Sequence, residues 1–82
     1  MLILDRRKHE CVFLFLPNDD AILIKVVNGV HGRGVALGFG VPDNVIVMRD
    51  DHVSIVTEYG ETSPNATFAV EQVVGDVYRR VR

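Results

Sequence analysis

Short apolar segments separated by turn residues constrain the fold of this chain more than any other feature. The segments occupy residues 1–7, 11–16, 21–27, 35–39 and 45–49. Their length suits strands and is short for helices, and their many valines and isoleucines favour extended backbone. Turn signals such as Pro17-Asn18-Asp19-Asp20 and Asn28-Gly29 lie between them. The first part of the chain therefore predicts a mainly β fold with a small, five-stranded antiparallel β domain.

The first segment, Met1-Leu2-Ile3-Leu4-Asp5-Arg6-Arg7, runs from apolar residues into a double arginine. Successive side chains of a strand point to opposite faces, so Leu4 and Arg6 share one face. By the same alternation, Val47 and Arg49 share a face of the last predicted strand. Each strand thus presents an apolar side chain beside an arginine. The alternative is that Arg6 and Arg7 are solvated charges at a strand end that deter edge-to-edge aggregation.

The last third of the chain is less regular. The acidic pair Asp50-Asp51 is suited to capping a helix over residues 52–59, whereas the β-branched residues there favour a sixth strand. We leave both open. Ser63-Pro64 is typical of a helix start, and the basic residues near residue 80 suit a helix end. We therefore expect a β domain over residues 1–59, with that helix or strand, and a C-terminal tail over residues 60–82 that is helical.

Composition narrows the possible functions. A chain of 82 residues makes one small domain whose core is marginal, and oligomerisation is a common remedy. The formal net charge of −2 argues against gripping nucleic acid mainly through phosphates. Any nucleic-acid role must therefore rest on a few placed arginines and on contacts with bases.

The sequence also bears on the cellular setting. The only cysteine, Cys11, cannot form an intramolecular disulfide, which fits a reducing, cytoplasmic compartment. Charges at residues 5–7 interrupt the apolar start, so we expect no signal peptide. The apolar runs are too short to cross a membrane.

Nothing in the sequence indicates catalysis or a cofactor. His9, His31 and His52 are scattered, with no cysteine or carboxylate at metal-ligand spacing. The pairs Asp19-Asp20 and Asp50-Asp51 are adjacent, so their carboxylates should diverge instead of cooperating in acid–base chemistry. We expect no enzyme, no metal and no cofactor.

Three segments in a fixed order resemble a known family. They are the opening residues 1–7, the run Gly32-Arg33-Gly34-Val35-Ala36-Leu37-Gly38, and Pro42, Val45, Val47 and Arg49 followed by Asp50. Together with Glu10 they resemble the CsrA/RsmA carbon storage regulators, small bacterial proteins that bind messenger RNA. The resemblance covers residues 1 to about 53. The chain resembles a divergent member, with an extended second hairpin over residues 15–21, His9 in place of a usual glycine, and an added tail.

The resemblance implies an intertwined homodimer in which the first strand of one subunit lies beside the fifth strand of the other. It places Leu4, Arg6 and Arg7 of one chain near Val47, Met48 and Arg49 of its partner. Such a surface reads GGA-containing hairpin loops in mRNA, which represses translation or alters mRNA stability. The implied partners are mRNA or small regulatory RNA and a second copy of the chain, with no membrane, and the resemblance also allows a protein antagonist.

A second interpretation keeps the fold and changes the function. Asp5 stands where the family usually has Thr or Ser, the chain is slightly acidic, and the tail has no counterpart. These features suit a CsrA-fold protein-interaction module, or a paralogue with lost or modified RNA binding.

Overall fold

The computed structural model describes residues 1–28 and 33–82, and the regular secondary structure within them is β-strand apart from one 3₁₀ turn. The strands are β1 (Leu2–Arg6), β2 (Cys11–Phe15), β3 (Asp20–Lys25), β4 (Val35–Phe39), β5 (Ile46–Arg49), β6 (Val53–Thr57), β7 (Gly60–Glu61), β8 (Phe68–Val74) and β9 (Val77–Arg80). One short 3₁₀ turn, η1 (Asp50–His52), joins β5 to β6. No helix in these residues is long and apolar enough to cross a membrane. The predicted turn residues Gly29 and Gly32, and His31, lie outside the described residues.

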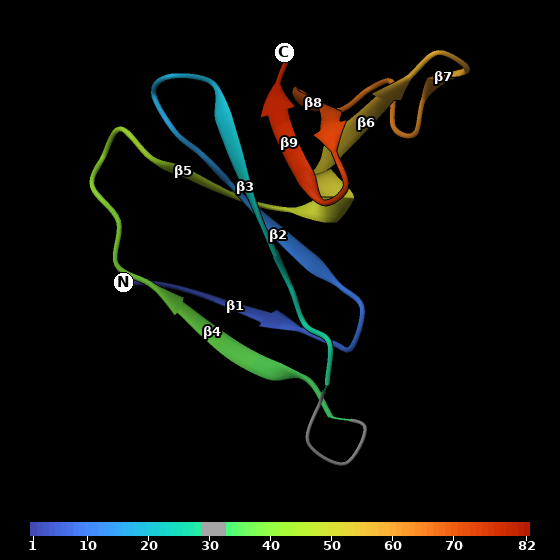
Figure 1. Cartoon of the computed structure of the whole chain (residues 1–82). Helices are drawn as coiled ribbons and strands as arrows, with labels where there is room; N and C mark the ends of the chain where they lie inside the picture. The colour runs from blue at the N-terminus through green and yellow to red at the C-terminus, as the bar shows by residue number, and fades with distance from the viewer. Residues whose placement is uncertain (29–32) are drawn as a thin grey trace.

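The strands form two sheets (Figure 1). One contains only β1 and β4, paired antiparallel from Leu2 opposite Phe39 to Arg6 opposite Val35. The other has seven strands in the order β5-β2-β3-β9-β8-β6-β7. All strand pairs are antiparallel except β6 with β8. The small sheet lies apart from the large one, so β1 and β5 share no backbone ladder.

The predicted helix in the C-terminal tail is wrong, although the mainly β class is correct. Residues 60–82 form β7, β8 and β9, and the segment after η1 takes the strand alternative as β6. The valines of β8 and β9 favour strands. Gly75 has φ +52°, a left-handed conformation that glycine adopts without strain and that turns the chain between the two strands. The basic residues cross the hairpin instead of ending a helix, since Arg79 Nε lies 2.6 Å from Glu71 Oε1.

The tail supplies much of the core. Phe13 and Phe15 of β2 are buried together with Ala21, Val53 and Val70. The Tyr78 ring meets Phe13 edge-on at 5.5 Å between centroids, and Phe68 stacks on Phe15 at 5.1 Å. Such aromatic pairs contribute beyond their buried area. The residues after the β5–η1 segment are therefore part of the same folded unit as β2 and β3.

The extended hairpin and the tail depend on each other. Leu16 follows β2, and its N–H donates to the Asp20 carbonyl at 2.9 Å, which closes a three-residue loop over Pro17 to Asp19. Asp19 takes the left-handed conformation that such loops need, with φ +70°. Strand β9 pairs at this tip, with Arg79 opposite Asp20 and Tyr78 opposite Ala21. The Arg80 N–H also donates to the Asp19 carbonyl at 2.7 Å. The segment over residues 15–21 is thus the docking point for the tail.

The turn between β1 and β2 keeps its shape without the usual glycine. The Glu10 N–H donates to the Arg7 carbonyl at 3.0 Å, which closes a four-residue turn. His9 within this turn has φ +72°, where an L-residue is strained and glycine is not. The His9 N–H donates to the Val26 carbonyl at 2.6 Å, and this bond helps to hold the conformation.

The aromatic core gives a stability prediction. Phe15 is 1% exposed and touches rings from both ends of the chain, so Phe15→Ala should lower the free energy of unfolding by about 3–5 kcal/mol. Tyr59→Ala is the matched control, because Tyr59 is 93% exposed. Urea denaturation at one protein concentration measures both. Equal losses for the two variants would contradict this core.

Candidate functional site

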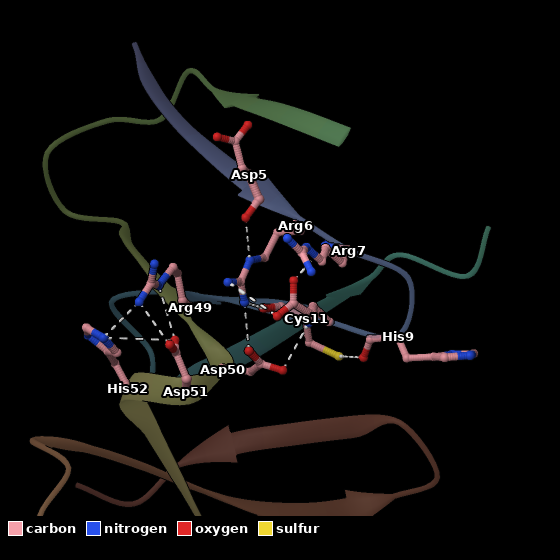
Figure 2. A network of polar contacts seen from close by, with 10 residues as sticks. Asp5, Arg6, Arg7, His9, Cys11, Arg49, Asp50, Asp51 and His52 are labelled. Atoms are coloured by element: carbon pink, nitrogen blue, oxygen red, sulfur yellow. Dashed lines mark hydrogen bonds and ion pairs between the residues drawn. The ribbon is translucent and has the colours of Figure 1, made fainter. Parts of the chain in front are cut away.

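The ends of β1, β2 and β5 meet around η1 in a network of charged side chains (Figure 2). Arg6, whose side chain is 6% exposed, donates from Nη1 to Asp50 Oδ1 at 2.9 Å. The other oxygen of Asp50 accepts the Cys11 N–H at 3.1 Å. Glu10 Oε2 lies 3.7 Å from the Arg6 guanidinium. The Asp50 carboxylate therefore joins the end of β1, through Arg6, to the start of β2, through the Cys11 N–H.

This network gives Arg6 a structural role. A buried guanidinium is costly unless it is paired and hydrogen-bonded, and Arg6 satisfies that requirement with Asp50, the Cys11 carbonyl at 3.5 Å and the Asp5 carbonyl at 2.9 Å. The pair connects the small β1–β4 sheet to the large sheet, which share no backbone ladder. Arg6 thus lies inward, on the face that it shares with Leu4.

Arg49 occupies a more open position at the end of β5. Its side chain is 41% exposed. Its Nε and Nη2 donate to the two oxygens of Asp51 at 3.1 and 2.9 Å, a two-bond fork that fixes the guanidinium plane. Nη2 also lies 3.2 Å from His52 Nε2, which accepts a hydrogen bond only when that nitrogen carries no proton. Arg49 is therefore oriented, partly open to solvent and locally charge-balanced.

Leu4, Val47 and Met48, which were also predicted as site residues, lie with Arg49 around one shallow hollow between β1 and β5. Its lining consists of Leu2, Leu4, Val47, Met48, Arg49 and His52. The structure thus brings Leu4 together with all three predicted residues of β5 within one chain. Arg7 lies outside this group, exposed on the opposite face of β1, and its side chain makes no ion pair within the described part of the chain.

Sequence reasoning did not identify Asp51 and His52 as neighbours of Arg49. A signal was present, because both follow Arg49 within three residues, where a turn returns their side chains to it. Sequence reasoning also gave no sign that Asp50 pairs with Arg6, because the two residues are 44 positions apart.

The histidine, cysteine and acidic residues of this network bear on metal binding and on thiol reactivity. Among residues 1–28 and 33–82, no group of three or more His, Cys, Asp or Glu could hold a metal ion. Burial raises the pKa of the Cys11 thiol, and the Asp50 carboxylate raises it further. A thiol with a raised pKa stays protonated at neutral pH and is a poor nucleophile.

Both strands that border the hollow have an open edge. Within the described residues, β1 pairs only with β4, and β5 pairs only with β2. An isolated two-stranded sheet is marginal in water, and an open strand edge presents unpaired backbone groups to a partner. On β1 the exposed apolar residues Leu2 and Ile3 lie along such an edge.

Comparison with known protein families decides the relationship. The family model of CsrA, described as a global regulator protein family, matches residues 1–58. The chain belongs to the CsrA family. No curated protein and no solved structure matches the chain. The match ends after β6, so the CsrA-like part contains every predicted site residue, and β7, β8 and β9 lie beyond it.

Asp5 departs from the CsrA pattern without disturbing the network. Figure 2 shows its carboxylate pointing away from the Arg6 guanidinium. Only its backbone carbonyl contacts Arg6, by accepting a hydrogen bond from Nε. The negative charge therefore lies on the face opposite Leu4 and Arg6.

The Arg6–Asp50 pair gives a second stability prediction. Asp50→Asn removes the charge that balances a buried guanidinium, and we expect the free energy of unfolding to fall by about 2–3 kcal/mol. Asp51→Asn is the matched control, because the Arg49–Asp51 pair is exposed and should cost less than about 1 kcal/mol. Urea denaturation of both variants makes the comparison. Equal losses would show that Arg6 does not depend on Asp50.

Proposed function

We propose that this chain is an RNA-binding post-transcriptional regulator that acts as a homodimer on GGA-containing hairpin loops in mRNA. Binding there represses translation or alters mRNA stability. Membership of the CsrA family over residues 1–58 supports the class of function. The observation that carries the proposal is the Arg49 guanidinium, held in a fork at the rim of an apolar hollow.

The open edges of β1 and β5 support the dimer. If β1 of one chain adds to β5 of another, both edges gain a ladder and the marginal two-stranded sheet joins a larger one. Exposed apolar residues on β1, Leu2 at 45% and Ile3 at 62%, favour such an addition. The proposed site then combines Leu4, Arg6 and Arg7 of one chain with Val47, Met48 and Arg49 of the other.

The chemistry of the site suits unpaired bases. Loop bases are unstacked, so their edges and faces can be read by side chains. A planar guanidinium matches O6 and N7 of guanine, and Leu4 and Val47 offer apolar contact with a base. Arg7, which makes no ion pair with a described residue, suits a phosphate. Because Asp50 and Asp51 balance Arg6 and Arg49, base contacts should dominate over phosphate attraction.

A second candidate is a CsrA-fold protein-interaction module without RNA binding. One observation favours it: carboxylates of the chain itself occupy both Arg6 and Arg49. RNA must then replace or share the Asp51 fork in order to contact Arg49. A titration with RNA hairpins separates the two candidates.

The direct test is a titration with RNA hairpins. We expect the chain to bind a hairpin with GGA in its loop more tightly than one with the same bases scrambled, at a fixed salt concentration because phosphate contacts are screened by salt. Equal affinity for both hairpins, or no binding to either, contradicts RNA regulation. A stable protein complex under those conditions would then support the interaction module.

The role of Arg49 gives a residue-level prediction. Arg49→Ala should weaken binding to the GGA hairpin by about 1–3 kcal/mol if the guanidinium reads a base. Arg79→Ala is the matched control, since Arg79 is also a surface arginine paired with a carboxylate, Glu71, but lies in the tail. The same affinity for both variants would remove Arg49 from the site.

A further inference from the structure

A second hollow lies directly beside the first. Its volume is about 470 Å³, within the range of small-molecule sites in proteins. Met48 and His52 line it from β5 and η1, and Ser63, Asn65, Thr67 and Phe68 line it from the tail. Met48 and His52 also line the hollow that contains Arg49. The two hollows therefore adjoin at Met48 and His52.

The loop that forms the far wall is held in place by the end of the chain. Arg82 donates from Nη2 to the Ala66 carbonyl at 2.9 Å. Its guanidinium is fixed in turn by Glu61, with 2.7 Å between Nη1 and Oε1. Within the loop, the Ala66 N–H donates to the Ser63 carbonyl at 2.9 Å. The wall is preformed, which lowers the entropy cost of binding.

The polar groups of this wall have unused hydrogen-bonding capacity. The side chains of Ser63, Asn65 and Thr67 make no hydrogen bond with any residue of 1–28 or 33–82, whereas Thr57 and Thr62 nearby both do. An amide offers donors and an acceptor, and a hydroxyl offers both. Phe68 and Met48 add apolar surface. Donors and acceptors next to apolar surface suit a flat heteroaromatic ring.

The charges around the hollow allow a nucleotide to approach. The nearest carboxylate, Asp51, is balanced by Arg49. Arg80 lies with its guanidinium carbon 4.7 Å from the centre of the Phe68 ring, and it makes no ion pair with a described residue. Arg80 does not itself line the hollow, but its positive charge lies next to Phe68, which does.

We propose that this hollow binds one unpaired nucleobase of the same RNA, adjacent to the bases that contact Arg49. The proposal rests on the proposed function and deepens it. Because Ser63 to Phe68 lie beyond the matched residues 1–58, the contact would be an addition of this chain to the CsrA-like site. The tail would then contribute to RNA specificity as well as to the core.

Hairpins that lack one base, combined with a variant of the tail, test whether the hollow binds a nucleobase. Single abasic nucleotides are placed in turn at the positions flanking GGA in the hairpin loop. For the wild-type chain, one of these positions should weaken binding about three- to tenfold, the value of a hydrogen bond or a stack. Asn65→Ala should weaken binding to the intact hairpin by a similar factor. It should cause no further loss of affinity for the hairpin that is abasic at the sensitive position. Asn44→Ala, an exposed turn asparagine distant in sequence, is the matched control.

The outcomes of this experiment separate the base-binding hollow from the proposed RNA-binding function. Independent effects of Asn65→Ala and the abasic substitutions, or no effect of Asn65→Ala, would overturn this inference while GGA discrimination leaves the proposed function intact. If the hollow binds a protein segment instead of a base, the effects of Asn65→Ala and of the abasic substitutions should likewise be independent, and the inference fails. Loss of GGA discrimination in the wild-type chain would overturn both.

Discussion

The pairing of Arg6 with Asp50 is the contact on which the arrangement of the site depends. It is the charged link between a two-stranded sheet and a seven-stranded sheet that share no backbone ladder. It also fixes the start of η1, because the second oxygen of Asp50 holds the Cys11 N–H. The next two residues of η1 orient Arg49. The ion pair of the buried Arg6 therefore lies one turn of chain before the residues that orient the partly exposed Arg49.

The tail explains how such a small chain completes its core. Its aromatic residues cover Phe13 and Phe15, and β9 pairs with the tip of the β2–β3 hairpin. The β2–β3 hairpin, which we expected to be extended, and the tail beyond the matched residues 1–58 thus form one contact. The same tail presents a preformed loop beside the Arg49 hollow. Added structure and proposed added recognition come from one segment.

The sequence predicted those parts of the fold that depend on local pattern. Period-two alternation and turn residues located the first five strands and placed Leu4 with Arg6. The prediction of a helical tail was wrong because the apolar residues from Phe68 to Tyr78 fit both a helical and an extended spacing. The strand is favoured by pairing with the tip of the β2–β3 hairpin, which is distant in sequence. Burial of Arg6 was missed for the same reason, since Asp50 is 44 residues away. The division at residue 59 and the RNA contacts stay predictions.

The central claim is that each RNA site combines β1 of one chain with β5 of its partner, and mixed dimers test it most directly. Arg7→Ala and Arg49→Ala chains with different tags are unfolded, refolded together and purified as the heterodimer. A shared site predicts that this heterodimer regains one intact site, and so binds one GGA hairpin with wild-type affinity. If both arginines act within a single chain, neither site is intact, and wild-type affinity would not return.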